Sequence, residues 1–490
     1  MKVLFLYPEF PNTFWSFKHA LKFIDKKAST PPLGLLTIAA MLPANWEKRL
    51  VDVNVQPLTQ DDLDWADWVM ISAMVVQRES TKELIQRCKT AGKIIIAGGP
   101  LFTSEYKEFP EVDHFILNEG ELTLPLFLQD WAHGTEQRIY QSDQYADIQT
   151  TPAPLWGLAD LSQYATMSIQ FSRGCPYNCD FCNVTALLGH KPRTKTAQQL
   201  IKELDDLYAL GWRDQVFVVD DNFIGNKKVL KQEVLPALIE WQKGKTGIPF
   251  NTEVSINLAD DPVLMRMMVE AGFDTVFVGI ETPNEESLAE CSKSQNRNRD
   301  LVKSVHAIQR AGIQVQGGFI VGFDSDTPSI FKRQLEFIRE SGIVTAMIGL
   351  LQAPAGTTLY KRLKKEGRLL GEMTGDNGDG STNIIPKLDL GLLQDGYRSL
   401  VQDLYAPREY YRRVLTLLKN IEPPKVVRLL DKTYLRAFFR SVYQLGIKGT
   451  ERVEYWKLVL WAMFRKPKLF SQAITLAIYG HHFRTLADEI

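Results

Sequence analysis

Three cysteines lie close together in the segment Cys175-Pro-Tyr-Asn-Cys179-Asp-Phe-Cys182. This C-x3-C-x2-C spacing allows three thiolates to meet one inorganic centre from a single short loop. A four-iron cluster has four iron corners, so three cysteine ligands leave one iron open to a ligand of another kind. Zinc is the main alternative, but structural zinc requires four ligands, and neither a fourth cysteine nor a suitably spaced histidine accompanies the three. The motif therefore favours an iron–sulfur cluster.

The other two of the five cysteines, Cys88 and Cys291, lie apart from this loop, and we expect them to be structural or incidental. A disulfide framework spreads its cysteines along the chain, whereas here they are bunched and odd in number. No apolar run is long enough to span a membrane, and the short run at residues 2–7 does not resemble a signal peptide. These observations predict a reduced, cytoplasmic protein.

Charge is divided unevenly along the chain. The 490 residues carry 57 Lys and Arg against 58 Asp and Glu, and a net charge of −1 gives no indication of nucleic-acid binding. Residues 405–490 contain 16 basic and 7 acidic residues (+9), which leaves −10 for residues 1–404. Because the basic residues of this tail alternate with Trp, Tyr and Phe, one hypothesis is peripheral contact with an anionic membrane surface. A helical cap with a solvated cationic face explains the same composition.

The cysteine loop follows the first of six strand-like runs that alternate with helical segments such as 196–210 and 300–311. This alternation predicts a partial (β/α)6 barrel of the TIM type over residues 163–368, with its chemistry at the carboxyl ends of the strands. The six runs are Met167–Phe171, Val216–Val219, Asn251–Ile256, Thr275–Gly279, Gln316–Val321 and Met347–Leu351.

Residues 1–140 show the same alternation, with five strand-like runs: Val3–Tyr7, Arg49–Val55, Trp68–Met74, Lys93–Gly98 and His114–Asn118. This pattern predicts a doubly wound, Rossmann-like parallel sheet, whose ligands bind beyond the carboxyl ends of its strands. The proline-containing stretch 141–162 is interpreted as a linker. Residues 369–490 are interpreted as a polar loop, 369–383, followed by a basic α-helical extension.

With Phe181 before its last cysteine, the loop resembles the signature of the radical S-adenosylmethionine (SAM) superfamily. The resemblance implies that the open iron binds SAM, and that one electron from an external reductant of the flavodoxin or ferredoxin type cleaves it to a 5′-deoxyadenosyl radical. Asp220-Asp221-Asn222 stands where the family often has G-G-E, and acids there can still meet the SAM ammonium group. The SAM-binding positions that the resemblance implies are Phe181, Asp220, Asp221, Asn222, Glu253, Ser255, Gly279, Glu281 and Gly318.

The first domain resembles the cobalamin-binding domain of the cobalamin-dependent branch of this superfamily, whose early loop looks like Pro31-Pro-Leu-Gly34. It has no D-x-H-x-x-G motif, so no protein histidine is expected below the cobalt. The resemblance implies that cobalamin is held by residues at the carboxyl ends of the strands. These candidates are Ser72, Gln77, Gly98, Gly99, Glu119 and Gly120.

The C-terminal region is similar to that of a subgroup that includes enzymes methylating hopanoids and bacteriochlorophylls. The resemblance implies a radical SAM C-methyltransferase that moves a methyl group from methylcobalamin to an unactivated carbon of a hydrophobic small molecule, an isoprenoid lipid or a tetrapyrrole. A cobalamin enzyme that uses hydrogen abstraction for oxidation, cyclisation or ring contraction is the alternative, and a cobalamin sensor with a vestigial cluster is a third hypothesis. The sequence identifies no catalytic acid or base.

Overall fold

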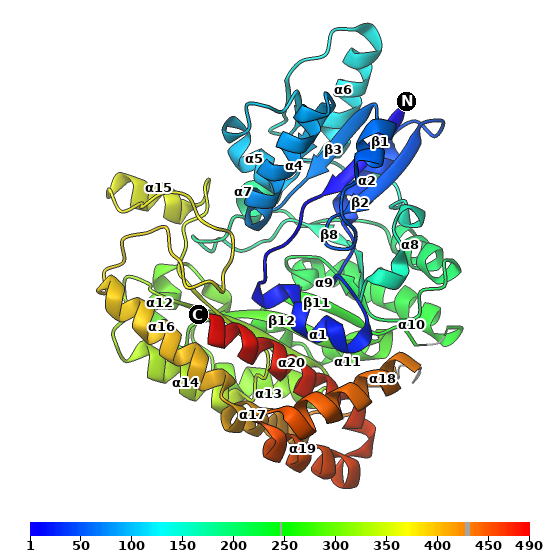
Figure 1. Cartoon of the computed structure of the whole chain (residues 1–490). Helices are drawn as coiled ribbons and strands as arrows, with labels where there is room; N and C mark the ends of the chain where they lie inside the picture. Colours follow the sequence, from blue (N-terminus) through cyan, green and yellow to red (C-terminus); the bar gives the residue numbers. More distant parts are fainter. Residues whose placement is uncertain (246, 427–431) are drawn as a thin grey trace.

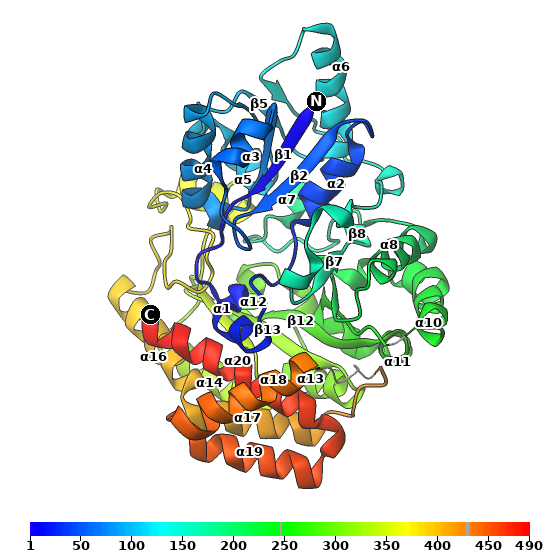
Figure 2. The ribbon, with the colours of Figure 1, turned by 45° about the vertical axis from the view of Figure 1, so that its right-hand side comes forward.

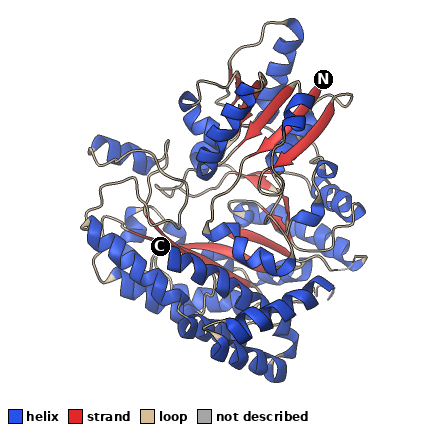
Figure 3. Ribbon diagram, viewed as in Figure 1, coloured by secondary structure: helices blue, strands red, loops and turns tan. Residues whose placement is uncertain are grey.

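Two parallel six-stranded sheets organise the chain, one above the other in Figure 1. This computed structural model describes residues 1–245, 247–426 and 432–490. Helices of the C-terminal region pack beneath the second sheet, as the blue ribbons of Figure 3 show. The α/β fold class predicted from the sequence is confirmed, with an N-terminal doubly wound sheet, a partial barrel and a helical C-terminal part. The domain boundaries at residues 140, 162 and 368 stay predictions.

The first sheet has the strand order β2-β1-β3-β4-β5-β6, and its central strands β1, β3 and β4 are buried on both faces. Val3 and Phe5 pack with helices α2 and α6 on one face, whereas Leu4 and Leu6 pack with α3, α4 and α5 on the other. A strand covered on both faces is a continuous apolar run, which is why β1 reads Lys-Val-Leu-Phe-Leu-Tyr. The strands are β1 (Lys2–Tyr7), β2 (Glu47–Asp52), β3 (Trp68–Ser72), β4 (Ile94–Gly98), β5 (His114–Ile116) and β6 (Ile139–Tyr140), and the helices are α2 (Leu33–Met41), α3 (Gln60–Trp65), α4 (Arg78–Thr90), α5 (Pro100–Glu105) and α6 (Gly120–His133).

Strand β6 corrects the prediction of five strands. It pairs in parallel with β5, with Ile139 opposite Phe115. Two residues are too few to show the alternation that identifies a strand, so β6 could not be predicted from its pattern. The run predicted over 49–55 also differs, because β2 begins at Glu47 and ends at Asp52.

The second sheet has the order β7-β10-β11-β12-β13-β14, so successive strands are neighbours and β7 and β14 form the two open edges. All six predicted strands are present: β7 (Met167–Ile169), β10 (Val216–Val218), β11 (Phe250–Val254), β12 (Phe273–Glu281), β13 (Gln314–Val321) and β14 (Ala346–Leu350). The side chains of Thr196 and Asp300 cap α8 and α13, as expected for helices beginning there. The helices of the barrel are α8 (Ala197–Ala209), α9 (Lys227–Val229), α10 (Leu235–Lys243), α11 (Pro262–Ala271), α12 (Glu285–Glu290), α13 (Leu301–Arg310) and α14 (Ile330–Ser341).

A short antiparallel hairpin frames the cysteine loop. Its strands are β8 (Ser172–Arg173) and β9 (Arg193–Thr194), and the loop with helix α7 (Val184–Leu188) lies between them. This hairpin was not predicted, because strands of two residues show no periodic pattern. The hairpin brings the two ends of the cysteine loop together.

The segment between β1 and α2 leaves the first sheet and packs on the lower half of the molecule, where Figure 2 shows it as the dark blue turns beside β12 and α20. It forms η1 (Phe14–Ser16), α1 (Lys18–Leu21) and η2 (Lys22–Ile24). Phe14 stacks on Phe483 of α20, with ring centroids 4.3 Å apart. Nothing in the sequence analysis anticipated this excursion.

The C-terminal region is helical, as predicted, and its last two helices are separated at Pro467. Before it, residues 366–389 form a loop that reaches the first domain, where Arg78 donates to the carbonyl of Met373 at 3.0 Å. No helix among the described residues is long and apolar enough to cross a membrane. Helix α15 (Thr358–Lys365) precedes this loop, and the helices that follow it are α16 (Leu390–Tyr405), α17 (Pro407–Asn420), α18 (Lys432–Ser441) continuing into the π-helical η12 (Val442–Lys448), α19 (Arg452–Arg465) and α20 (Phe470–Glu489).

Candidate functional site

The cysteine loop is anchored by backbone hydrogen bonds at both ends. Cys175 N–H donates to Gly189 O at 3.2 Å, and Asp180 N–H donates to Cys291 O at 3.1 Å. Gly174, just before the loop, has φ +93°, and a β-carbon there would meet three carbonyl oxygens at about 3 Å. The loop is therefore held in one shape by the chain itself.

Polar hydrogen atoms approach two of the thiols. The side-chain amide of Asn222 lies 3.9 Å from Cys175 Sγ, and that of Gln295 lies 3.7 Å from Cys179 Sγ. Burial raises the pKa of Cys182 to about 12, and the positive charge of Lys293 acts against that rise. Amide donors and a cation beside thiols suit sulfur atoms that carry negative charge when they ligate iron.

The three described thiols are not placed to share a single metal ion. Tetrahedral zinc would hold its thiolates within about 4 Å of one another. Within the described part of the chain, no three His, Cys, Asp or Glu side chains are placed to hold one metal ion. A four-iron cluster binds each cysteine at a separate corner and so accepts wider spacing. The three cysteines fit a cluster better than they fit zinc.

Three acidic side chains lie at and beside the carboxyl ends of β10 and β11. Asp220 is fully buried and accepts hydrogen bonds from Phe171 N–H (2.8 Å) and Ser172 Oγ (2.5 Å), so it positions β8. Asp221 is accessible to solvent, although burial of its carboxyl raises its pKa to about 6. Burial and the neighbouring acids raise the pKa of Glu253 to about 8.

Glu253 has no hydrogen-bond partner among the described residues, whereas both ends of the Asn222 side-chain amide have partners. Asn222 Oδ1 accepts from the backbone N–H of Ser255 at 3.2 Å, and its amide faces Cys175. Clustered carboxylates without a cation raise one another's pKa, and a bound cation would reverse this. Asp221 and Glu253 therefore fit a ligand with a positive charge, such as the ammonium or sulfonium group of SAM.

Glu281, predicted to contact SAM, is paired within the protein. Its carboxylate accepts from Lys293 Nζ at 2.6 Å, and both side chains are nearly buried. Gly279 leaves room for this pair, because a β-carbon there would overlap Glu281 Oε1 and lie 2.8 Å from Lys293 Nζ. Gly318 likewise leaves room for Phe277. Lys293 and Gln295 follow no recognised motif, and the sequence analysis missed both.

Phe181 does not stand among these acids. It packs at the edge of a small core behind the cysteine loop, with its ring 6.3 Å from that of Phe323. Lys293 Nζ lies 5.9 Å from the ring centroid of Phe181. The same lysine thus links Phe181, Glu281 and the thiols.

The cobalamin candidates lie at the carboxyl ends of β3, β4 and β5, as predicted, but several are used within the protein. Gln77 donates to Pro8 O at 2.6 Å and accepts from Met74 N–H at 2.8 Å. A β-carbon on Gly98 would lie 2.7 Å from Ile116 O. On Gly120 it would lie 2.5 Å from Ile38 Cδ1, and on Gly99 it would overlap Ser72 Oγ. These glycines are needed for internal packing, whatever else they contact.

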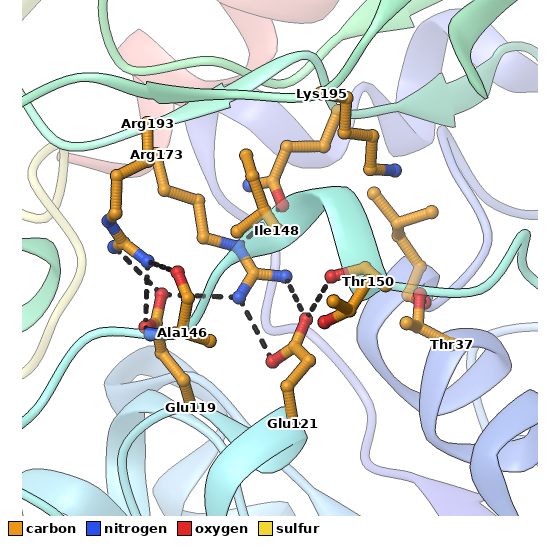
Figure 4. A network of polar contacts seen from close by, with 12 residues as sticks. Thr37, Glu119, Glu121, Ala146, Ile148, Thr150, Arg173, Arg193 and Lys195 are labelled. Atoms are coloured by element: carbon orange, nitrogen blue, oxygen red, sulfur yellow. Dashed lines mark hydrogen bonds and ion pairs between the residues drawn. The ribbon is translucent and has the colours of Figure 1, made fainter. Parts of the chain in front are cut away.

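Glu119 belongs to a buried ion-pair network between the two halves of the molecule (Figure 4). Its carboxylate accepts from Arg193, Arg173 and the backbone N–H of Ala146, at 2.6–3.2 Å. Arg173 also binds Glu121 at 2.8 Å. All four charged side chains are at most 16% exposed. The network ties α6 to the hairpin that frames the cysteine loop, and it occupies both oxygens of Glu119.

We expect Glu121→Ala to destabilise the protein by about 3 kcal/mol. The buried positive charge of Arg173 would then have only Glu119 of its two acidic partners. Burial acts to raise the pKa of Glu121, yet Arg173 holds it below its ordinary value, which reflects the strength of the pairing. The change in the free energy of unfolding is measured from the urea midpoint, and Glu111→Gln, at an exposed position, is the control. The double variant with Arg173→Met should cost less than the two single variants together. Strictly additive costs would contradict the pairing.

Alternate residues of the barrel strands face the interior. On β12, Val278 packs with the outer helices in the core, so Phe277 faces the other way. The register places Glu253 of β11 beside Phe277, and Met347 of β14 beside Gly318. Trp15 of the N-terminal excursion covers this wall. Its ring meets that of Phe277 edge to face at 5.2 Å, and its Nε1 lies 3.1 Å from Met347 Sδ.

Family models match three consecutive regions of the chain. Residues 25–128 match a B12 binding domain, residues 169–349 match the radical SAM superfamily, and residues 357–490 match a domain of unknown function, DUF4070. These regions contain the first sheet's β2–β5, the cysteine loop with the barrel, and the C-terminal helices, respectively.

Relatives match the chain along its whole length. An uncharacterized methyltransferase of Synechocystis sp. is 42% identical over 99% of this chain and 91% of its own. The hopanoid C-2 methylase of Rhodopseudomonas palustris is 33% identical over 100% of this chain and 94% of its own. The solved structure of the cobalamin-dependent SAM radical enzyme OxsB with aqua-cobalamin has a similar fold, with a TM-score of 0.63, 15% identity, and coverage of 96% of this chain and 80% of that one.

These matches confirm the predicted family, enzyme class and cofactors, whereas the individual SAM and cobalamin contacts stay predictions. The three matched regions stand in the order that the sequence predicted. The chain belongs to the cobalamin-dependent radical SAM methyltransferase family, whose cofactors are a 4Fe-4S cluster, SAM and cobalamin.

Proposed function

We propose that this enzyme methylates an unactivated carbon of a hydrophobic, polycyclic isoprenoid lipid. When bound, the cluster and SAM supply a hydrogen-abstracting radical, and cobalamin supplies the methyl group. Cys175, Cys179 and Cys182 would hold the cluster. Asp221 and Glu253 would receive the positive charge of SAM. An external one-electron reductant of the flavodoxin or ferredoxin type is part of the proposal.

The observation that carries the substrate class is the division of the barrel interior. Carboxylates stand on the β10–β11 side, whereas Phe277, Met347 and Trp15 form an apolar wall over β12–β14. Trp15 contacts Phe277 and Met347, yet 38% of its surface is exposed. This exposed face is available to an apolar ligand. The name of the hopanoid C-2 methylase points to the same chemical class. Such a substrate resides in membranes, so peripheral contact of the basic C-terminal region with a membrane also belongs to the proposal.

The test is anaerobic reconstitution with iron, sulfide, SAM, cobalamin, reduced flavodoxin and a total lipid extract. A lipid that gains one CH2, with S-adenosylhomocysteine and 5′-deoxyadenosine formed in equal amounts, supports the proposal. A product without the added CH2 identifies the non-methylating alternative. Methylation of a tetrapyrrole from a pigment extract, but of no lipid, overturns the substrate class. Absence of SAM cleavage under reducing conditions favours the sensor hypothesis.

We expect Trp15→Ala to lower kcat/KM for the lipid on the order of 30-fold, because it removes a large apolar surface from the proposed substrate wall. Cleavage of SAM without substrate should change little, since Trp15 contacts Phe277 and Met347 and not the carboxylates. Trp15→Phe, which keeps an aromatic face, should recover most of the activity. Equal losses of both reactions would indicate that Trp15 only supports the fold.

A further inference from the structure

Helices α18 and α19, with η12 between them, carry a concentration of exposed apolar side chains. Their inner faces pack on α20 and the neighbouring helices through buried residues such as Ala437, Leu445 and Leu458. Elsewhere on the described chain the large exposed apolar residues are scattered. We call the outer face of these helices the apolar ridge. It consists of Leu435, Phe439, Tyr443, Ile447, Val453, Trp456, Leu460, Met463 and Phe464, which are 37–76% exposed.

The residues of the ridge stand on elements that contact one another, since η12 packs against both α18 and α19. Leu435, Phe439, Tyr443 and Ile447 recur every four residues and so share one helix face. Trp456 Nε1 donates to Gly446 O at 2.9 Å, which holds the first turns of α19 against η12. A group of large exposed apolar side chains on neighbouring elements is typical of an interaction surface.

The charges around the ridge are positive. Glu451 and Glu454 are the acidic residues of the described stretch 432–470, and both are paired, with Arg484 and Lys457 respectively. Apart from Lys457, the cations on and beside α19 have no ion pair to a described residue. These are Lys448, Arg452, Arg465, Lys466 and Lys468.

We propose that the apolar ridge docks on the interfacial layer of an anionic lipid bilayer. Exposed Phe, Trp, Leu and Met flanked by Lys and Arg form the side-chain set of helices that lie in a membrane interface. Cations near an anionic bilayer add electrostatic attraction. A second copy of this chain would present the same positive charge, so self-association is disfavoured. The inference deepens the proposed function by naming the surface that makes the membrane contact, and it rests on the proposed function for the lipid nature of the substrate.

The ridge is connected to the proposed substrate wall through the N-terminal excursion. Arg440 of α18 donates to the carbonyl of Lys22 at 2.9 Å and pairs with Asp25 at 2.6 Å. Phe17, two residues from Trp15, packs on Tyr479 of α20 with ring centroids 4.9 Å apart. The segment that carries Trp15 therefore lies against helices whose outer faces form or adjoin the ridge.

The test is co-sedimentation of the reconstituted full chain with vesicles of phosphatidylcholine alone or mixed equally with phosphatidylglycerol. We expect binding to the mixed vesicles that weakens with added salt. The variant Phe439→Glu/Phe464→Glu should bind at least about tenfold more weakly. Leu126→Glu, on an exposed position of the first domain, is the matched control and should bind like the wild type. Thermal melting verifies that both variants fold.

Three outcomes overturn the proposal: no binding by the wild type, equal binding by the double variant, or dimerisation of the wild type through the ridge in analytical ultracentrifugation. Methylation of a detergent-dispersed lipid separates this inference from the proposed function. The double variant should keep that activity and lose activity on vesicle-borne lipid. If the double variant bound vesicles normally but lost both activities, the docking role of the ridge would be contradicted. The proposed function of the wild type would still stand.

Discussion

Cys179→Ala is expected to remove the iron–sulfur cluster and to reduce SAM cleavage by at least about a thousand-fold, because electron transfer to SAM depends on the cofactor and no side chain can replace it. Cys179 comes from the middle of a loop whose two ends are fixed by the β8–β9 hairpin. The loop should therefore keep its backbone shape in the variant. Iron and sulfide content after anaerobic reconstitution, and the electron paramagnetic resonance signal of the reduced protein, measure the loss.

Cys291→Ser is the matched control for this prediction. Cys291 is buried close to the loop, but only its backbone carbonyl holds the loop, through Asp180 N–H. A variant that keeps this carbonyl should retain iron, sulfide and SAM cleavage. A full complement of four irons in Cys179→Ala, or loss of the cluster only in Cys291→Ser, would contradict the ligand assignment.

The elements that could be predicted from the sequence are those whose pattern is local. The six barrel strands are apolar or alternating runs bounded by helices with recognisable caps such as Thr196 and Asp300. Strand β6 and the β8–β9 hairpin are only two residues long in each strand, so they carry no period. The excursion of residues 10–28 depends on packing against α20, hundreds of residues away, and such contacts leave no local pattern.

The site residues also divide into those that a local sequence pattern identifies and those that it does not. The cysteines were predictable because one loop supplies all three, and the acids were predictable because they stand at strand ends. Lys293 acts through space on Glu281 and the thiols, and Trp15 reaches the barrel from the segment between β1 and α2, so neither follows from spacing. Glu119 stands at a strand end, but its position in the sequence does not reveal its ion pairs within the protein. A carboxylate after a strand suggested a ligand contact, but two arginines from the barrel side occupy it.

The last prediction concerns Glu253, whose surroundings are unfavourable to the protein without its ligand. Burial and the charges of Asp221 and Asp220 raise the pKa of this carboxyl to about 8. The unfolded chain loses the proton at the ordinary pKa of glutamate, so raising the pH from about 4.5 to 8 progressively penalises the folded state. Glu253→Gln removes that penalty. We expect the cofactor-free variant to be more stable than the wild type by roughly 2 kcal/mol at pH 8.

The same substitution should weaken SAM binding by about 30-fold, because it removes a carboxylate from the group that would meet the positive charge of SAM. Equilibrium dialysis of the cluster-loaded protein measures the affinity, and urea unfolding at pH 5 and pH 8 measures the stability. Glu233→Gln, on an exposed helical position, should change neither quantity. If Glu253 had a purely structural role, its substitution would lower the stability of the protein and leave the SAM affinity unchanged. A gain in stability combined with a loss of affinity is the signature of a side chain retained for its ligand, since the cofactor-free fold alone would favour its replacement.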